Sequence, residues 1–255
     1  MQRSISYRPL KEGNGAGEAA ARAFARAAIF ERVWLHAALE LPVLRARAEP
    51  IAAVHGERLV GLGAALAGLF PFRVAAIDAV LPGVAAGLLE RFEPPFVCHA
   101  PVRLARELAR AGGRLIRRER QMVRFQPPQQ RRGIDPQIER LNDADELVRF
   151  CGPAFAPLEL ELAPFLGLRD AFGELCAVAG ARFVTERVAQ IGHLDTRDDC
   201  RRQGHARSLA GALACALESP ERRVLVHVAE SALGSERLFG ALGFRGAHDF
   251  AVFAR

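Results

Sequence analysis

The chain has 255 residues and half of them are hydrophobic, so it can bury one large core or two modest ones. Its net charge of +6 comes almost entirely from arginine, Lys11 being the single lysine, and this looks like a coding preference rather than a nucleic-acid surface. No apolar run has the length of a bilayer span and no signal-peptide pattern opens the chain, so we expect a cytoplasmic protein that does not insert into membranes.

Five cysteines are scattered along the chain without Cys-x-x-Cys pairs or histidines at ligand spacing. We therefore expect neither disulfides nor a bound metal.

In chain order, the first half predicts a long amphipathic helix, a set of apolar strands and two strand-helix pairs. Proline and glycine residues mark the connections between them. The expected helices cover residues 18–39, 84–92 and 102–111, and the expected strands cover 51–55, 58–68, 73–80, 96–99 and 114–125.

The stretch 114–132 is the densest in arginine, but it contains one aromatic residue, Phe125, and so lacks platforms on which bases could stack. A solvated strand face and turn is the favoured interpretation, and an interaction or nucleic-acid-binding face is the weaker alternative. Residues 126–133 have the composition of a linker. We place a domain boundary there, which gives domains 1–130 and 131–255.

The second half begins with an expected helix over residues 143–150, in which Asn142 or Asp143 can cap the first amides and Glu146 sits at capping-box distance. Residues 152–164 are punctuated by prolines and predict helical turns around a pocket. Two antiparallel strands are expected at 173–178 and 181–195, joined by a turn at Ala179 and Gly180.

A basic glycine turn follows that strand and leads directly into a helix. The turn is Arg201-Arg202-Gln203-Gly204-His205-Ala206, and apolar residues at helical spacing continue from it to Leu217. The first amides of a helix have no internal partners and, with the helix dipole, they favour a phosphate or pyrophosphate. Strand, basic glycine turn and helix thus predict a site for a diphosphate-bearing ligand.

The Arg-x-x-Gly-x-Ala pattern at 201–206 resembles the phosphate-binding motif of the GNAT acetyltransferases. A second segment, Leu238 to Phe244, is similar to the family's Leu-Tyr-x-x-x-Gly-Phe segment, and a strand and helix lie between the two in the expected order. The resemblance implies the α/β (α+β) GNAT fold, a mixed, mostly antiparallel sheet flanked by helices. Residues 51–111 look like a degenerate copy without the glycine turn, so we expect a tandem arrangement whose first half binds no CoA.

By resemblance, the end of the central strand holds the acyl carbonyl and the pantetheine arm, and the glycine turn holds the pyrophosphate. Phe239 stands where many relatives carry the tyrosine that acts as general acid, and His193 is the candidate base because it lies on the central strand. Alternative bases are Glu174, Glu186, Glu230 and His227. The residues expected to bind the cofactor are Leu194, Asp195, Thr196, Arg201, Arg202, Gln203, Gly204, His205, Ala206, Arg207, Ser235 and Phe239.

The resemblance therefore implies an N-acetyltransferase that moves an acetyl or acyl group from acetyl-CoA to a primary amine by direct attack, without a metal. The acceptor is a small molecule or a peptide. A CoA-binding module without catalysis is the alternative, suggested by Phe239 in place of tyrosine. The sequence does not identify the acceptor. It also does not distinguish a monomer from a homodimer.

Overall fold

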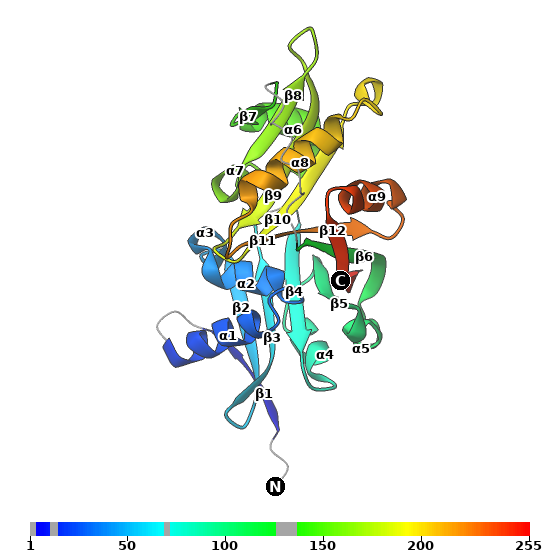
Figure 1. The fold of residues 1–255 in the computed structure, drawn as a ribbon. Helices are drawn as coiled ribbons and strands as arrows, with labels where there is room; N and C mark the ends of the chain where they lie inside the picture. Colours follow the sequence, from blue (N-terminus) through cyan, green and yellow to red (C-terminus); the bar gives the residue numbers. More distant parts are fainter. Residues whose placement is uncertain (1–3, 11–14, 69–71, 126–136) are drawn as a thin grey trace. The chain divides into compact units, whose positions relative to one another are not determined.

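The computed structural model describes residues 4–10, 15–68, 72–125 and 137–255 (Figure 1). These residues form two compact units, Met1–Glu119 with His248–Arg255, and Arg120–Ala247. The linker expected at 126–133 lies outside the described residues. The units differ from the expected domains 1–130 and 131–255 in two respects. The boundary lies between residues 119 and 120, and the last eight residues join the first unit.

The first unit is a sheet with helices packed against it. Its helices α1 and α2 pack against β3, and α4 packs against β3 and β4 (Figure 1). Its elements are β1 (Ile5–Pro9), α1 (Gly15–Ala27), α2 (Val33–Glu40), α3 (Pro42–Arg45), β2 (Ala48–His55), β3 (Arg58–Leu66), β4 (Arg73–Ala79), α4 (Val84–Leu89), β5 (Phe96–Pro101), η1 (Val102–Leu104), α5 (Ala105–Arg110) and the start of β6 (Arg114–Arg124).

Strands β1 to β4 of the first unit pair antiparallel in chain order, and β5 then lies parallel to β4. The sheet is completed by the end of β12 (Phe244–Ala254), whose residues Phe250 to Ala254 pair antiparallel with β5. Apolar side chains of α4, α5 and strands β3 to β5 form the core, together with Ala251 and Phe253 of the last strand. The final residues are thus part of the first unit's core.

The second unit repeats the order of three antiparallel strands, a helix, a parallel strand and a helix. Helix α8 packs on strands β8, β9 and β10 (Figure 1). The elements are the end of β6, β7 (Glu139–Leu141), α6 (Ala144–Cys151), η2 (Gly152–Ala154), α7 (Glu159–Leu162), β8 (Phe165–Arg169), β9 (Leu175–Val184), β10 (Val188–Thr196), η3 (Asp198–Cys200), α8 (His205–Leu217), β11 (Arg223–Ala229), α9 (Leu233–Ala241) and the start of β12.

In this unit β7, β8, β9 and β10 pair antiparallel, and β11 lies parallel to β10. Among the described residues, no helix is both long enough and apolar enough to cross a bilayer. The expected cap of α6 is confirmed, since the Asp143 side chain accepts a hydrogen bond from the Glu146 amide at 3.0 Å.

The single helix expected over residues 18–39 is wrong, because α1 ends at Ala27 and α2 begins at Val33. Arg32 explains the interruption. Its buried guanidinium donates to the Phe24 carbonyl at 2.5 Å, lies over the Phe24 ring and pairs with Asp78 of β4. The ion pair between buried Arg32 and Asp78 coincides with the break between the two helices. The spacing of apolar residues does not predict this break, because the pair joins distant parts of the chain.

The turn expected at Ala179 and Gly180 is also wrong, because β9 runs through both residues to Val184. An added Cβ at Gly180 would lie 2.2 Å from the Phe165 ring, so this glycine makes room for an aromatic side chain. The true turn is at residues 185–187, where the Thr185 hydroxyl donates to the Val188 carbonyl and accepts from the Val188 amide.

Candidate functional site

The central strands of the second unit separate partway along their length. Strand β10 pairs with β11 only from Val188 to Ile191, although β10 continues to Thr196 and β11 to Ala229. On its other side β10 remains paired with β9 as far as Thr196. The β11-facing backbone groups between residues 192 and 196 therefore have no ladder partner in the described sheet, and they can hydrogen-bond a ligand.

A bulge at Gly192 marks the point of separation. The register between β9 and β10 shifts on both sides of Ile191, so that His193 lies opposite Gly180. An added Cβ at Gly192 would lie 2.0 Å from the Arg182 side chain, which crosses over the strand at this point. Glycine is thus required by the close approach of Arg182.

The glycine turn expected from the sequence leads into α8 as predicted. Gly204 is the residue before the helix and adopts the left-handed conformation, with φ of 90°, and Arg202 has φ of 62°. No side chain caps this helix, and the first helical bond runs from the Ser208 amide to the Gly204 carbonyl. The amides of His205, Ala206 and Arg207 are therefore free of helical partners and point out of the N-terminus.

The end of β10 beyond its pairing with β11 and the start of α8 line one cavity of about 850 Å³ within the second unit. A cavity of this size accommodates a cofactor-sized molecule. Nine of the expected cofactor-binding residues line it: Leu194, Asp195, Thr196, Arg201, Arg202, Gly204, His205, Ala206 and Arg207. Its remaining lining residues were not expected from the sequence and are Arg149, Phe150, Arg197, Cys200, Gly234 and Leu238.

Among the described residues, the lining of the cavity has more arginines than carboxylates. Arg149, Arg202 and Arg207 line it and form no ion pair with any described carboxylate. Arg201 instead holds the loop, because it pairs with Asp198 at 2.7 Å and donates to the Thr196 carbonyl at 3.2 Å. Three unpaired guanidinium groups beside open helix amides favour a ligand with several anionic oxygens.

Arg197 holds the end of β10 in place. It bonds Asp170 at 2.6 Å, Asp199 at 2.7 Å and the Leu175 carbonyl at 3.2 Å. The hydrogen bonds from Arg197 lower the pKa of Asp170 and that of Asp199, because they stabilise both carboxylates. We call Arg197 with its partners Asp170 and Asp199 the clamp. It connects the β8–β9 turn to the loop that precedes the glycine turn.

The expected base, His193, is buried beside the cavity and does not line it. Its Nε2 lies 2.6 Å from Glu159 of α7, which is fully buried and also pairs with Arg182. The Phe155 and Phe165 rings pack around the imidazole. A buried carboxylate held by two partners fixes the orientation of His193. Asp195, two residues along the same strand face, is the member of this group that reaches the cavity.

Three other expected site residues do not line the cavity, namely Gln203, Ser235 and Phe239. Phe239 is 2% exposed and packs edge-on against Phe244 at 5.2 Å. Leu238 and Gly234 of the same helix face the cavity instead. The alternative bases Glu174, Glu186, Glu230 and His227 are likewise absent from its described lining. The phase of a short helix such as α9 cannot be fixed from its sequence, which is why the neighbouring residues were missed.

The first unit has a comparable strand separation, but its own side chains fill it. Strand β5 pairs with β4 only up to His99 and Ala76, and the cavity lined by these residues measures about 10 Å³, about the space of one water. The helix that follows β4 also begins after a left-handed glycine, Gly83. There the Ala86 amide donates to the Glu107 carboxylate at 2.8 Å, so an internal carboxylate occupies the place of a ligand anion.

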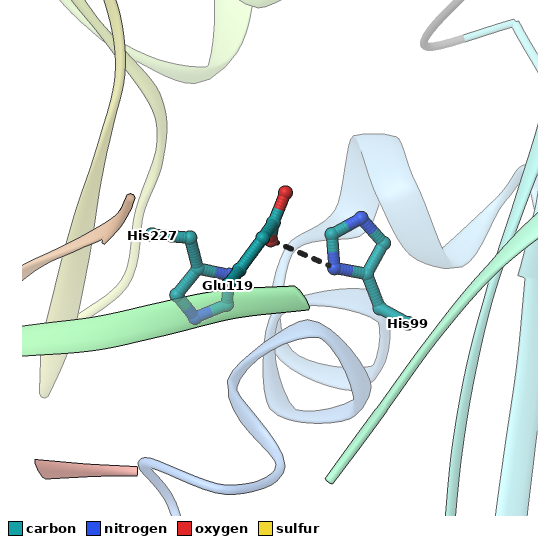
Figure 2. A group of neighbouring side chains, drawn as sticks. All are labelled: His99, Glu119 and His227. Atoms are coloured by element: carbon teal, nitrogen blue, oxygen red, sulfur yellow. Dashed lines mark ion pairs between the residues drawn. The ribbon is translucent and has the colours of Figure 1, made fainter. Parts of the chain in front are cut away.

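Three of the five arginines of strand β6 lie beside acidic side chains. In the first unit Arg117 donates to Glu119 at 2.7 Å, and Figure 2 shows the Glu119 carboxylate directed at His99, with an oxygen 3.6 Å from Nδ1. In the second unit Arg120 pairs with Glu236 and buried Arg124 lies near Glu218. Arg131 and Arg132 lie outside the described residues. Compensated arginines of this kind do not favour the nucleic-acid alternative.

Comparison with known proteins agrees with this architecture. The sequence model of the family described as FR47-like protein matches residues 165–251, which include the central strands, the glycine turn and α9. No similar protein is found among curated sequences.

Solved structures resemble three quarters or more of the chain. A putative acetyltransferase from the GNAT family of Novosphingobium aromaticivorans is 22% identical, with a TM-score of 0.58 over 75% of this chain and 86% of that one. A Drosophila protein is 14% identical, with a TM-score of 0.75 over 99% of both chains. A tandem GNAT protein from the clavulanic acid biosynthesis pathway is 15% identical, with a TM-score of 0.60 over 99% of this chain and 98% of that one.

The fold predicted from the sequence is thereby confirmed, because the chain has the fold of these GNAT structures. More narrowly, residues 165–251 carry the sequence pattern of the FR47-like family.

Proposed function

We propose that the second unit binds acetyl-CoA and transfers its acetyl group to a primary amine. The observation that carries this proposal is the convergence of the strand separation and the open N-terminus of α8 on one cavity. The helix amides and the free arginines suit the pyrophosphate, and the unpaired edge of β10 suits the amides of the pantetheine arm. The acceptor is a small molecule or peptide that carries the amine.

In this reaction the amine nitrogen forms a bond to the acetyl carbon while the carbon–sulfur bond breaks, and the proton of the amine must be taken up. The chain would contribute mainly by orientation, because the unpaired edge of β10 can hold the pantetheine arm and so position the thioester for attack. Backbone groups near Leu194 can polarise the acetyl carbonyl as charge develops on its oxygen.

We propose that His193 accepts the proton of the amine. Asp195, which lines the cavity, would relay this proton from the amine to the buried imidazole. Glu159 positions the imidazole and stabilises it after protonation. Phe239 cannot donate a proton to the departing thiolate, and the thiolate is a tolerable leaving group near neutral pH. Replacement of His193 by Gln is therefore expected to lower kcat with little change in acetyl-CoA affinity.

The cofactor site is tested by calorimetric titration of acetyl-CoA into the wild type and two glycine variants. Gly204→Glu places a carboxylate at the start of α8, and Gly83→Glu places one at the start of α4. The positions are matched, since both glycines precede a helix, have positive φ (90° and 80°) and would direct a Cβ into open space. The backbone strain is thus similar, and only the position relative to the proposed site differs.

We expect binding to be lost in Gly204→Glu and retained in Gly83→Glu. Equal loss in both variants, or retention in folded Gly204→Glu, would remove the site assignment. Binding by the wild type without thioester cleavage across a panel of amines would instead support the alternative, a non-catalytic acyl-CoA-binding module.

A further inference from the structure

Three potential metal ligands meet on the face of β10 next to α6. Cys151 is the last residue of α6, and His193 and Asp195 lie two residues apart on β10, so their side chains share one face of the strand. One donor atom of each residue lies within 4.8 Å of the others. This group is distinct from the glycine turn, and Asp195 alone of the three also lines the cavity.

The support around His193 is of the kind that metal sites require. Glu159 lies 2.6 Å from Nε2, and the imidazole is buried between the Phe155 and Phe165 rings. Histidine ligands usually donate one ring N–H to a carboxylate, which leaves the other nitrogen free to bind the ion. With Nε2–H donating to Glu159, the lone pair of His193 is on Nδ1.

The charge balance of the group also favours a cation. Arg182 neutralises Glu159, and no described cation forms an ion pair with Asp195.

We propose that Cys151, His193 and Asp195 form a binding site for Zn²⁺ or a similar borderline-soft divalent ion. One thiolate, one imidazole and one carboxylate are ligands that Zn²⁺ prefers, and they are poorly suited to Mg²⁺ or Ca²⁺. Three protein ligands leave the fourth tetrahedral position for water or a ligand in the cavity. The sequence predicted no metal because the ligands lie far apart along the chain.

Such an ion would link α6 to β10. Arg149 and Phe150 line the cavity and immediately precede Cys151, so ion binding would fix that part of the cavity wall. The ion would also occupy the lone pair of His193. If His193 is the base of the proposed acetyl transfer, Zn²⁺ should inhibit turnover. Binding of the ion does not depend on that activity.

The test is titration of Zn²⁺ into chelator-treated, reduced protein, followed by calorimetry and by thermal unfolding. Co²⁺ is then used as a spectroscopic probe, because a cobalt–thiolate bond gives a charge-transfer band in the near ultraviolet. We expect one ion per chain, a higher Tm with Zn²⁺ and a thiolate band with Co²⁺.

Two variants and a matched control assign the ligands. Cys151→Ser is expected to abolish the thiolate band and to weaken Zn²⁺ binding, and Glu159→Gln to weaken it by roughly 10- to 100-fold through the orientation of His193. Cys215→Ser changes a thiol of similar exposure on α8 that is outside the group, and it should bind Zn²⁺ as the wild type does.

The proposal is overturned if folded wild-type protein binds no Zn²⁺ at micromolar concentrations. It is equally overturned if Co²⁺ binds without a thiolate band, or if Cys151→Ser retains wild-type affinity. Asp195→Asn provides an independent check should Cys151→Ser fail to fold, and unchanged affinity in that variant would also exclude the site.

Discussion

At the scale of single residues, glycines in the second unit have different structural roles, and the sequence alone does not distinguish these roles. Gly204 is needed for its positive φ before α8. Gly192 and Gly180 are needed because other side chains, Arg182 and Phe165, occupy the space of a Cβ. The expected turn at Gly180 failed for this reason: a glycine inside an apolar run indicates either a bend or a close approach, and only the packing distinguishes them.

Gly180→Ala should therefore destabilise the protein by about 1–3 kcal/mol, since the added methyl group must displace the Phe165 ring from a filled core. The free energy of unfolding in urea measures this loss. Gly240→Ala in α9 is the control, because its Cβ would meet no atom within 4 Å and should leave stability unchanged or slightly raised. Similar values for the two variants would contradict the packing role of Gly180.

At the scale of elements, the glycine turn depends on the clamp that holds the end of β10. Arg197 connects Asp170 in the β8–β9 turn with Asp199 in η3, and η3 leads into the turn. The pattern Arg-x-x-Gly-x-Ala revealed the turn itself, because its chemistry is local. The clamp could not be predicted, since Asp170 and Arg197 are brought together only by the pairing of β9 with β10.

The clamp makes stability depend on acidity. The pKa values of Asp170 and Asp199 are lowered in the folded state, so the stability they contribute is present above their unfolded values, about pH 4, and is lost as pH falls through the folded values. Arg197→Met should lower Tm at neutral pH, and its difference from wild type should shrink toward pH 3. Arg140→Met, on the exposed edge strand β7, serves as control. A difference for Arg197→Met that does not change with pH would contradict the clamp.

At the scale of the whole molecule, the same order of elements occurs twice, and the chain's last strand completes the first unit. Residues Phe250 to Ala254 pair with β5, and Phe253 lies in the core of the first unit. The second unit keeps a cavity of about 850 Å³ among its described residues. In the first unit, an internal carboxylate and tightly packed side chains occupy the corresponding place.

Phe253→Ala should destabilise the protein by about 3–5 kcal/mol, because the ring is 1% exposed in the first unit's core. Hydrogen exchange should show lost protection at residues 96–101, the partner strand. Phe172→Ala is the control, with a ring that is 91% exposed and an expected effect within about 0.5 kcal/mol. Loss of protection in β9 and β10 instead would contradict the assignment of the last strand to the first unit.

The sequence by itself determined the fold class, most of the elements and nine lining residues of the cavity, because strand periodicity, the glycine turn and the helix that follows are local features. The tertiary structure decided which side chains meet across distant segments. It placed His193 against Glu159 rather than in the cavity, packed Phe239 on Phe244 and joined the last strand to β5. Such contacts depend on register and on helix phase, and a shift of one residue in either changes which side chains share a face.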